Sequence, residues 1–296
     1  MRSAVAVALA VALVAMTGCL GGPVEGIDAD ISPDVESVET NETGDEILAS
    51  SLNATEEADA YTVDSRHRFV AGASGVFDID FSMSSTGGFN PAEEEGVVTT
   101  DGKADFSFLI LGNQTDFETT IYTEGETTHR RKVENGDETG WSERAVNFTQ
   151  TESVLGTGAV EEAYCDADAE LLGGETIEGV ETYVLSLDVP PERVSRHSSA
   201  VISLHGAGLE ERDENMEGSG EGEASIEELS AYLWVERDSR RPVRMAHFIS
   251  MGGSEEGNAS EDSENDRESA VDFLFEANWG YGDVEVEEPE AVSDGV

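Results

Sequence analysis

Residues 77–84, Phe77-Asp78-Ile79-Asp80-Phe81-Ser82-Met83-Ser84, alternate without interruption between apolar and polar side chains. Successive side chains of a β-strand point to opposite faces of a sheet, so this stretch predicts a strand with one apolar and one polar face. Such a strand is typical of an antiparallel sheet with one solvated side. Further strands are expected at residues 61–69, 104–110, 117–123, 127–133, 169–177, 180–189, 229–236, 243–251 and 271–279, with a short final strand at 284–286.

Three helices are expected between these strands. The first covers residues 43–57, where Thr43 and Glu46 have the spacing of a capping box. The second covers residues 148–163, although Gly156 and Gly158 interrupt it. The third opens at Pro190-Pro191 and ends near Leu209. A continuous sheet of this length must twist and curl, and its apolar face must be covered. The sequence therefore predicts an α+β fold, in which a few helices cover the concave face of a long curved antiparallel β-sheet.

The predicted strands and helices make up one domain, residues 43–289. Two acidic loops without hydrophobic periodicity interrupt it, at 210–223 and 252–267. Residues 19–42 are acidic and punctuated by glycine and proline, so we expect a flexible tether there. Residues 290–296 are expected to be a disordered tail.

Residues 1–18 have the organisation of a secretory signal peptide. Arg2 precedes an apolar run, residues 4–15, that is too short to cross a bilayer core of about 30 Å as a helix. The small residues Thr17 and Gly18 then precede Cys19, whose thiol could form a thioether to a lipid. This stretch resembles the lipobox of secreted lipoproteins, which predicts lipid attachment at Cys19 and anchoring at the outer face of the cytoplasmic membrane. The alternative is an ordinary cleaved signal with an incidental cysteine.

The charge balance is strongly acidic. The chain of 296 residues has 65 acidic and 16 basic residues, a net charge of -49, and its only lysines are Lys103 and Lys132. Such a charge destabilises a compact state at low salt, whereas at molar salt a Debye length of about 3 Å screens the repulsion. Because the strand pattern argues against an acidic disordered chain, the composition predicts a protein from a halophile. With no basic patch to neutralise phosphates, nucleic acid is not an expected partner.

The cysteine count gives no disulfide framework. If Cys19 carries lipid, Cys165 has no partner, and we expect it to be a small buried apolar residue rather than a reactive thiol. An exported chain can also be glycosylated at Asn-x-Ser/Thr triplets on exposed loops. These triplets place acceptor asparagines at Asn41, Asn53, Asn113, Asn147 and Asn258.

A family resemblance comes from the last hairpin, Ala231-Tyr232-Leu233-Trp234-Val235-Glu236-Arg237-Asp238-Ser239-Arg240-Arg241-Pro242-Val243-Arg244. A strand containing aromatic-Trp, an acidic turn and a return strand that opens with Pro-Val-Arg resemble the LolA/LppX/LprG superfamily of lipoprotein carriers and lipid-binding lipoproteins. The closing stretch 281–289 and the order of elements are similar to that group as well. With the lipobox and the acidic bias, the chain resembles haloarchaeal lipoproteins of this kind. The resemblance implies a half-open antiparallel barrel, with helices on its concave side and a cavity for acyl or isoprenoid chains.

No catalytic signature is found in the sequence. Gly-x-Ser-x-Gly, His-Glu-x-x-His, phosphate-loop and EF-hand motifs are absent from it, so we expect no enzyme activity, cofactor or metal. His197 and His205 are eight residues apart on a predicted helix and could share a face, although surface or satisfied histidines explain them more simply. A hydrolase remains a third hypothesis, which would require a buried histidine–carboxylate pair in a cleft.

The candidate ligand-binding residues are aromatic side chains of the predicted strands. They have two interpretations, a filled sheet core beneath helices or the lining of an apolar pocket. The candidates are Phe77, Phe81, Phe106, Phe108, Trp234, Phe273, Phe275 and Trp279. The first hypothesis for function is a membrane-anchored lipoprotein that binds a hydrophobic ligand or lipid in a half-barrel. The alternative is a non-catalytic envelope interaction or structural module with a filled core.

Overall fold

The computed structural model describes residues 27, 31–56, 60–73, 77–108, 111–144, 146–191, 193–194, 196–197, 200, 225–252, 269–282, 284–289 and 292. At residues 56, 73, 77, 107–108, 111–113, 225 and 269–270 it describes the backbone but not the side chain. The predicted signal peptide, Cys19, and the loops at 210–223 and 253–267 lie outside the described residues.

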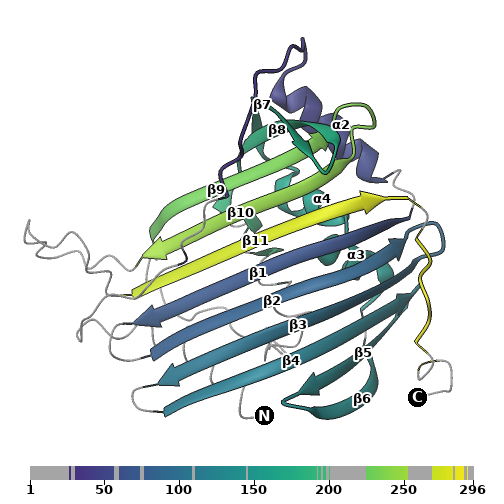
Figure 1. Cartoon of the computed structure of the whole chain (residues 1–296), viewed down its shortest axis with the longest axis vertical. Coiled ribbons are helices and arrows are strands. Elements are labelled where there is room, and N and C mark those ends of the chain that lie inside the picture. The colour runs from purple at the N-terminus through teal and green to yellow at the C-terminus, as the bar shows by residue number, and fades with distance from the viewer. Residues whose placement is uncertain are drawn as a thin grey trace, which may run out of the picture.

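Within these residues, eleven strands form one antiparallel sheet in the order β6-β5-β4-β3-β2-β1-β11-β10-β9-β8-β7 (Figure 1). The strands are β1 (Tyr61–Ala73), β2 (Phe77–Asn90), β3 (Glu95–Phe108), β4 (Leu111–Glu124), β5 (Thr127–Glu134), β6 (Asp137–Arg144), β7 (Asp168–Ile177), β8 (Val180–Asp188), β9 (Ser225–Glu236), β10 (Pro242–Gly252) and β11 (Ser269–Tyr281). The pairing of β1 with β11 joins the two halves of the chain at the middle of the sheet. With β6 and β7 as its edges, the sheet is open and curved, which confirms the predicted fold class.

The alternating stretch that predicts a strand at 77–84 is the first half of β2. Its register sets Phe81 opposite Phe69 on β1 and opposite Ala104 on β3. The sequence pattern does not predict β6, because residues 137–144 are exposed or half-buried and carry no apolar alternation. The strand predicted at 284–286 is wrong. Both sides of β11 are already paired, with β1 and β10, so the chain after Tyr281 has no neighbouring strand left to join.

The first predicted helix is α2 (Gly44–Glu56), and its capping box is present. The Thr43 hydroxyl accepts a hydrogen bond from the Glu46 amide at 3.2 Å, and the Glu46 carboxylate accepts one from the Thr43 amide at 2.9 Å. These two bonds satisfy amides that have no partner within the helix itself. The helix therefore begins where the sequence predicts.

The helix predicted at 148–163 forms as two short helices, α3 (Phe148–Leu155) and α4 (Gly158–Tyr164), with the break at the glycines that interrupt its sequence. The chain is extended at Gly156, and a side chain there would meet the Tyr61 hydroxyl at 2.3 Å. That hydroxyl accepts a hydrogen bond from the Thr157 amide at 3.1 Å and donates one to Glu152 Oε1 at 2.7 Å. Glu152 Oε1 also accepts the Gly158 amide at 2.8 Å. Together these groups bind the free amides of the second helix, which makes the break a stable feature.

Helix α3 begins with a second capping box. The Asn147 side chain accepts a hydrogen bond from the Gln150 amide at 2.9 Å, and the Gln150 side chain accepts the Asn147 amide at 3.1 Å. We expect Asn147→Ala to lower the free energy of unfolding by about 1 kcal/mol, as loss of an N-cap does elsewhere. Thr149→Ala is the matched control, because it removes the same glycosylation triplet and keeps the cap. Equal chemical unfolding midpoints for the two variants would contradict the capping role.

The third predicted helix is described in part. Residues 191, 193–194, 196–197 and 200 are helical, and the expected end near Leu209 lies outside the described residues. Cys165 corrects the expectation of a buried thiol. It is exposed at the end of α4, because the buried side of that helix is taken by its neighbour Tyr164.

The described part of the predicted tether is held against the domain. The amide and carbonyl of Glu36 pair with those of Gly174 on β7, both at 2.8 Å. Arg240 forms an ion pair with Glu42 at 2.6 Å. Of the predicted C-terminal tail, the described residue is Val292, which is buried and whose amide donates to the Pro289 carbonyl.

The two faces of the sheet carry different apolar clusters. The inner face is the one covered by α2, α3 and α4, and it holds the main core. In Figure 1, α3 and α4 lie behind the sheet toward the ends of β1 and β2 that carry Tyr61 and Asn90. The outer face carries a smaller apolar cluster on β1, β8, β9 and β10, which the residues before α2 cover. Its buried members are Ile27, Ile31, Val70, Val184, Trp234, Val243, Ala246 and Phe248.

Candidate ligand-binding face

The inner face brings together most of the predicted aromatic residues. Phe81, Phe273, Phe275 and Trp279 are buried in the main core, and Phe106 is half-buried against it. The side chains of Phe77 and Phe108 are not among those that the structure describes. The curved sheet therefore has one continuous apolar surface on its helix-covered side.

Trp234 lies on the outer face instead. Its register on β9, opposite Arg244 and Val184, places it away from the main core. The indole N–H donates to the Glu175 carboxylate at 2.7 Å, and the Arg244 guanidinium lies 4.6 Å from the ring centroid. This aromatic residue supports the outer cluster and takes no part in the inner face.

The half of the inner face beneath the helices is filled. Helix α2 supplies Ile47 and Leu48, α3 supplies Leu155, α4 supplies Tyr164, and Val194 comes from the helical segment after Pro191; all are buried. Phe148 at the start of α3 packs edge-on against Phe89 near the end of β2, with ring centroids 6.1 Å apart. This half is a packed core.

The same face continues apolar beyond the region where these helices make their contacts. A separate cluster, the distal patch, consists of Phe69, Ala71, Ile79, Phe106 and Val271. Ala71 pairs with both Ile79 and Val271, so the patch crosses three adjacent strands and reaches Phe106 on a fourth. Phe69, Phe106 and Val271 are only half-buried. An apolar surface that is still accessible, next to a packed core, is the chemistry expected of a site for a hydrocarbon chain.

A group of buried rings lies between the packed core and the distal patch. The His197 ring stands edge-on to His247, with centroids 5.5 Å apart, and to Phe275, at 4.8 Å. The Tyr164 hydroxyl is 3.2 Å from His247 Nδ1, and His197 Nε2 donates to the Val154 carbonyl at 3.1 Å. Burial lowers the pKa of His197 to about 4 and holds the pKa of His247 well below its ordinary value. Both rings are therefore neutral at physiological pH.

Whether His197 and His205 share a helix face is not tested, because His205 lies outside the described residues. Among the described part of the chain, no group of three histidine, cysteine or acidic side chains could hold a metal ion. His197 and His247 bond to a carbonyl and a tyrosine hydroxyl, so the histidine–carboxylate pair that a hydrolase would need is not formed by these two residues.

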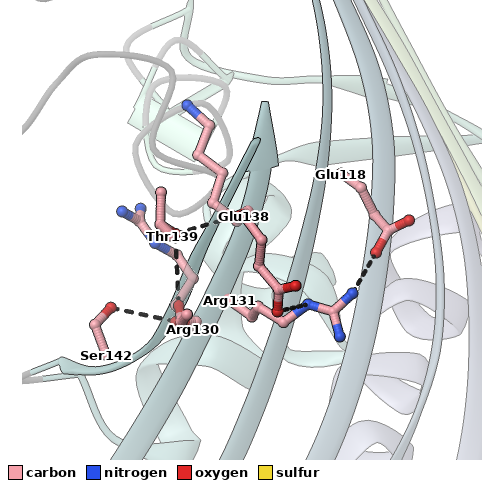
Figure 2. A network of polar contacts seen from close by, with 8 residues as sticks. Glu118, Arg130, Arg131, Glu138, Thr139 and Ser142 are labelled. Atoms are coloured by element: carbon pink, nitrogen blue, oxygen red, sulfur yellow. Dashed lines mark hydrogen bonds and ion pairs between the residues drawn. The ribbon is translucent and has the colours of Figure 1, made fainter. Parts of the chain in front are cut away.

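The outer face of β1 to β4 carries a hollow of about 670 Å³, the outer trough. Its charged lining residues are Arg66, Arg68, Asp101, Lys103, Asp116, Glu118 and Glu276. Figure 2 shows the neighbouring network on β4 to β6, in which Arg131 lies between Glu118 at 3.1 Å and Glu138 at 3.5 Å. The Ser142 hydroxyl also donates to the Arg130 carbonyl at 3.2 Å. Its lining also includes the apolar residues Met83, Phe117, Val133 and Leu274.

Three of the predicted glycosylation sites can be located. Asn41, Asn53 and Asn147 are exposed, while the side chains of Asn113 and Asn258 are outside those described. Asn53 lies within α2 and Asn147 caps α3, so these two sites belong to helices rather than loops. Of the helices that the structure describes, none combines the length and apolar character needed to cross a membrane.

Comparison with known proteins gives structural neighbours only. No family model matches the chain, and no curated protein matches its sequence. Solved structures similar to it include lipoprotein LppX of Mycobacterium tuberculosis, with 14% identity, 81% of this chain and 98% of that chain covered, and a TM-score of 0.37. A LolA superfamily protein from Nitrosomonas europaea has 13% identity, covers 82% and 96% of the two chains, and gives a TM-score of 0.23. A beta-barrel-like protein of unknown function from Brucella abortus has 10% identity, 76% and 99% coverage, and a TM-score of 0.27. The neighbours thus include members of the group that the last hairpin resembles.

Proposed function

We propose that the chain is an exported lipoprotein that binds a hydrophobic ligand, such as the acyl chain of a lipid, on the inner face of its half-barrel. The observation that supports this most directly is the distal patch, where Phe69, Phe106 and Val271 remain half-buried beside a packed core. Burying apolar surface is favourable by about 25 cal/mol per Å². A hydrocarbon chain laid along this patch would therefore be stabilised without any polar contact.

The proposed location and environment of this site come from other features of the chain. Lipid on Cys19 would anchor the protein to the outer face of the cytoplasmic membrane, close to a source of acyl chains. The net charge of -49 suits a halophile, because molar salt screens it. The exposed Asn41, Asn53 and Asn147 would be open to glycosylation after export.

The test is lipid occupancy. Protein purified from membranes in molar KCl is extracted and analysed by mass spectrometry, and we expect a co-purifying lipid in addition to the anchor. The double variant Phe69→Ser/Phe106→Ser removes about 100 Å² of apolar contact, which corresponds to about 2–3 kcal/mol of binding free energy and roughly a 50-fold loss of affinity. Its occupancy should be far below that of the wild type.

The matched control is Tyr232→Ser/Leu274→Ser, which removes two half-buried apolar side chains from the outer face. If the substitutions act only by lowering stability, lipid occupancy should fall in both double variants. Wild-type protein that carries no lipid, or equal occupancy in the two double variants, would refute ligand binding at the distal patch.

The second candidate is an envelope interaction module with a filled core. Two observations favour it: the packed half of the inner face, and the outer trough, whose lining includes charges of both signs. A partner crosslinked through the trough, together with lipid-free protein, would support this function over the first.

A further inference from the structure

The chain that follows the predicted anchor is fixed to the outer face at one defined place. The Ile27 amide donates a hydrogen bond at 2.9 Å to Oδ2 of Asp272 on β11. Oδ1 of the same carboxylate accepts the Ser250 hydroxyl at 2.7 Å, and Asp272 is buried. A buried carboxylate needs such donors, so this contact is specific and not a loose surface association.

Further contacts hold the segment along its length. We define the strap as the described residues 27 and 31–42. Ile27 and Ile31 are buried in the outer cluster with Trp234 and Phe248. Beyond them the strap pairs with Gly174 through Glu36 and ends at the ion pair of Glu42 with Arg240. The residues between Cys19 and Ile27 therefore set the largest distance between the proposed anchor and the docked strap.

The docking point at Asp272 and the distal patch lie on opposite faces of the same part of the sheet. Asp272 lies between Val271 and Phe273 on β11 and opposite Val70 on β1, whose neighbours Phe69 and Ala71 belong to the patch. The strap therefore leaves the domain at the same end of the strands at which the inner face is accessible. The packed half, with α3 against Tyr61 and Phe89, lies at the other end.

The length of the chain between Cys19 and the docking point at Ile27 determines which end of the sheet lies near the membrane. Seven residues lie between Cys19 and Ile27, so the two are at most about 27 Å apart even if the chain between them is fully extended. A strand of thirteen residues such as β11 is about 43 Å long. A lipid on Cys19 thus keeps the distal end of the sheet close to the bilayer, whereas the opposite end is not restrained.

We propose that the distal end of the sheet, where β1 and β10 end and β2 and β11 begin, is the surface that faces the membrane. This inference rests on the proposed anchor at Cys19 and specifies how the proposed ligand site is presented to it. Lipid chains can then pass between the bilayer and the distal patch without crossing the solvent.

Charge makes the approach of the distal end to the bilayer dependent on salt. Residues 253–268, which link β10 to β11 at this end, contain seven acidic residues and one arginine. Repulsion from an anionic bilayer is screened only where the Debye length is short, about 3 Å in molar salt. A test of the orientation therefore needs neutral lipid and high salt.

The experiment uses the full lipid-modified chain in phosphatidylcholine vesicles that contain a headgroup nitroxide lipid, in molar KCl. A fluorophore is attached to Asp105→Cys near the distal end or to Ala92→Cys in the turn between β2 and β3; both positions are exposed. Cys165→Ser removes the exposed native thiol from both proteins. We expect nitroxide quenching to be several-fold stronger at position 105 than at position 92.

The strap variant Ile27→Ser/Ile31→Ser should reduce that difference by at least half, because undocking the strap lengthens the free chain between Cys19 and the domain. Val35→Ser changes an exposed valine of the same strap and should keep the difference. Equal quenching at the two positions, or a difference that the strap variant leaves unchanged, would overturn the orientation. Co-purified lipid with equal quenching would overturn only the orientation, whereas protein that fails to join vesicles would overturn the anchor and the orientation together.

Discussion

Replacing Cys19 by serine should move nearly all of the protein from the membrane to the medium. The predicted anchor is a lipid on this thiol, and a serine hydroxyl cannot form the thioether. Each buried CH₂ of an acyl chain contributes about 0.8 kcal/mol, so two chains hold a protein stably where one does not.

Cell fractionation in molar KCl measures this effect directly. Cys165→Ser is the matched control, since it removes the other cysteine of the chain and should leave the protein on the membrane. Metabolic labelling with a radioactive fatty acid should mark the wild type and the control but not Cys19→Ser. If Cys19→Ser remains with the cells, the anchor is wrong, and the orientation inferred from the strap is wrong with it.

The strands were predictable because alternation reports directly on a sheet with one apolar face. The turns between them carry a second signal. Glu178 and Gly179 both have positive φ, at 51° and 90°, as the primed turns of two-residue hairpins require. Asn135-Gly136 has the same geometry, with φ of 52° and 88°, and Asn-Gly is the strongest short hairpin signal. Reading it would have revealed β6, whose own residues give no hydrophobic pattern.

The candidate site was only partly predictable because its residues meet across long distances in sequence. Phe69 lies opposite Phe273, and the contact depends on the pairing of β1 with β11, which local pattern does not specify. The sequence places Trp234 on the ligand face for a related reason. On β8 to β10 the outer face is apolar as well, because the strap covers it, so alternation does not reveal which side faces inward. Gly156 and Gly158 indicate a break between α3 and α4 in the sequence, but its stabilisation by Tyr61, a residue of another element, could not be predicted from local pattern.

Acidification should destabilise the fold through its buried histidines. The pKa of His197 is about 4 in the folded protein, against an ordinary value of 6.5, because burial disfavours the charged ring. Between these values the unfolded chain binds a proton that the folded chain does not. The free energy of unfolding should therefore fall as the pH decreases from about 6.5 to about 4, by about 3 kcal/mol from His197 alone. His247, whose pKa is lowered by burial and then by the nearby His197, should add to this loss.

Chemical unfolding in molar KCl at several pH values between 7 and 4 tests this prediction. Protonation of the many carboxylates relieves repulsion and acts in the opposite direction, so the informative quantity is the difference between wild type and His197→Leu. The variant should lose much of the acid-induced destabilisation whatever its stability at pH 7. His129→Leu, which removes a half-buried histidine from β5, is the control and should behave as the wild type. Parallel stability curves for wild type and His197→Leu would mean that the ring takes up its proton without leaving the core. In that case the junction between the packed core and the distal patch would be more open to water than its burial indicates.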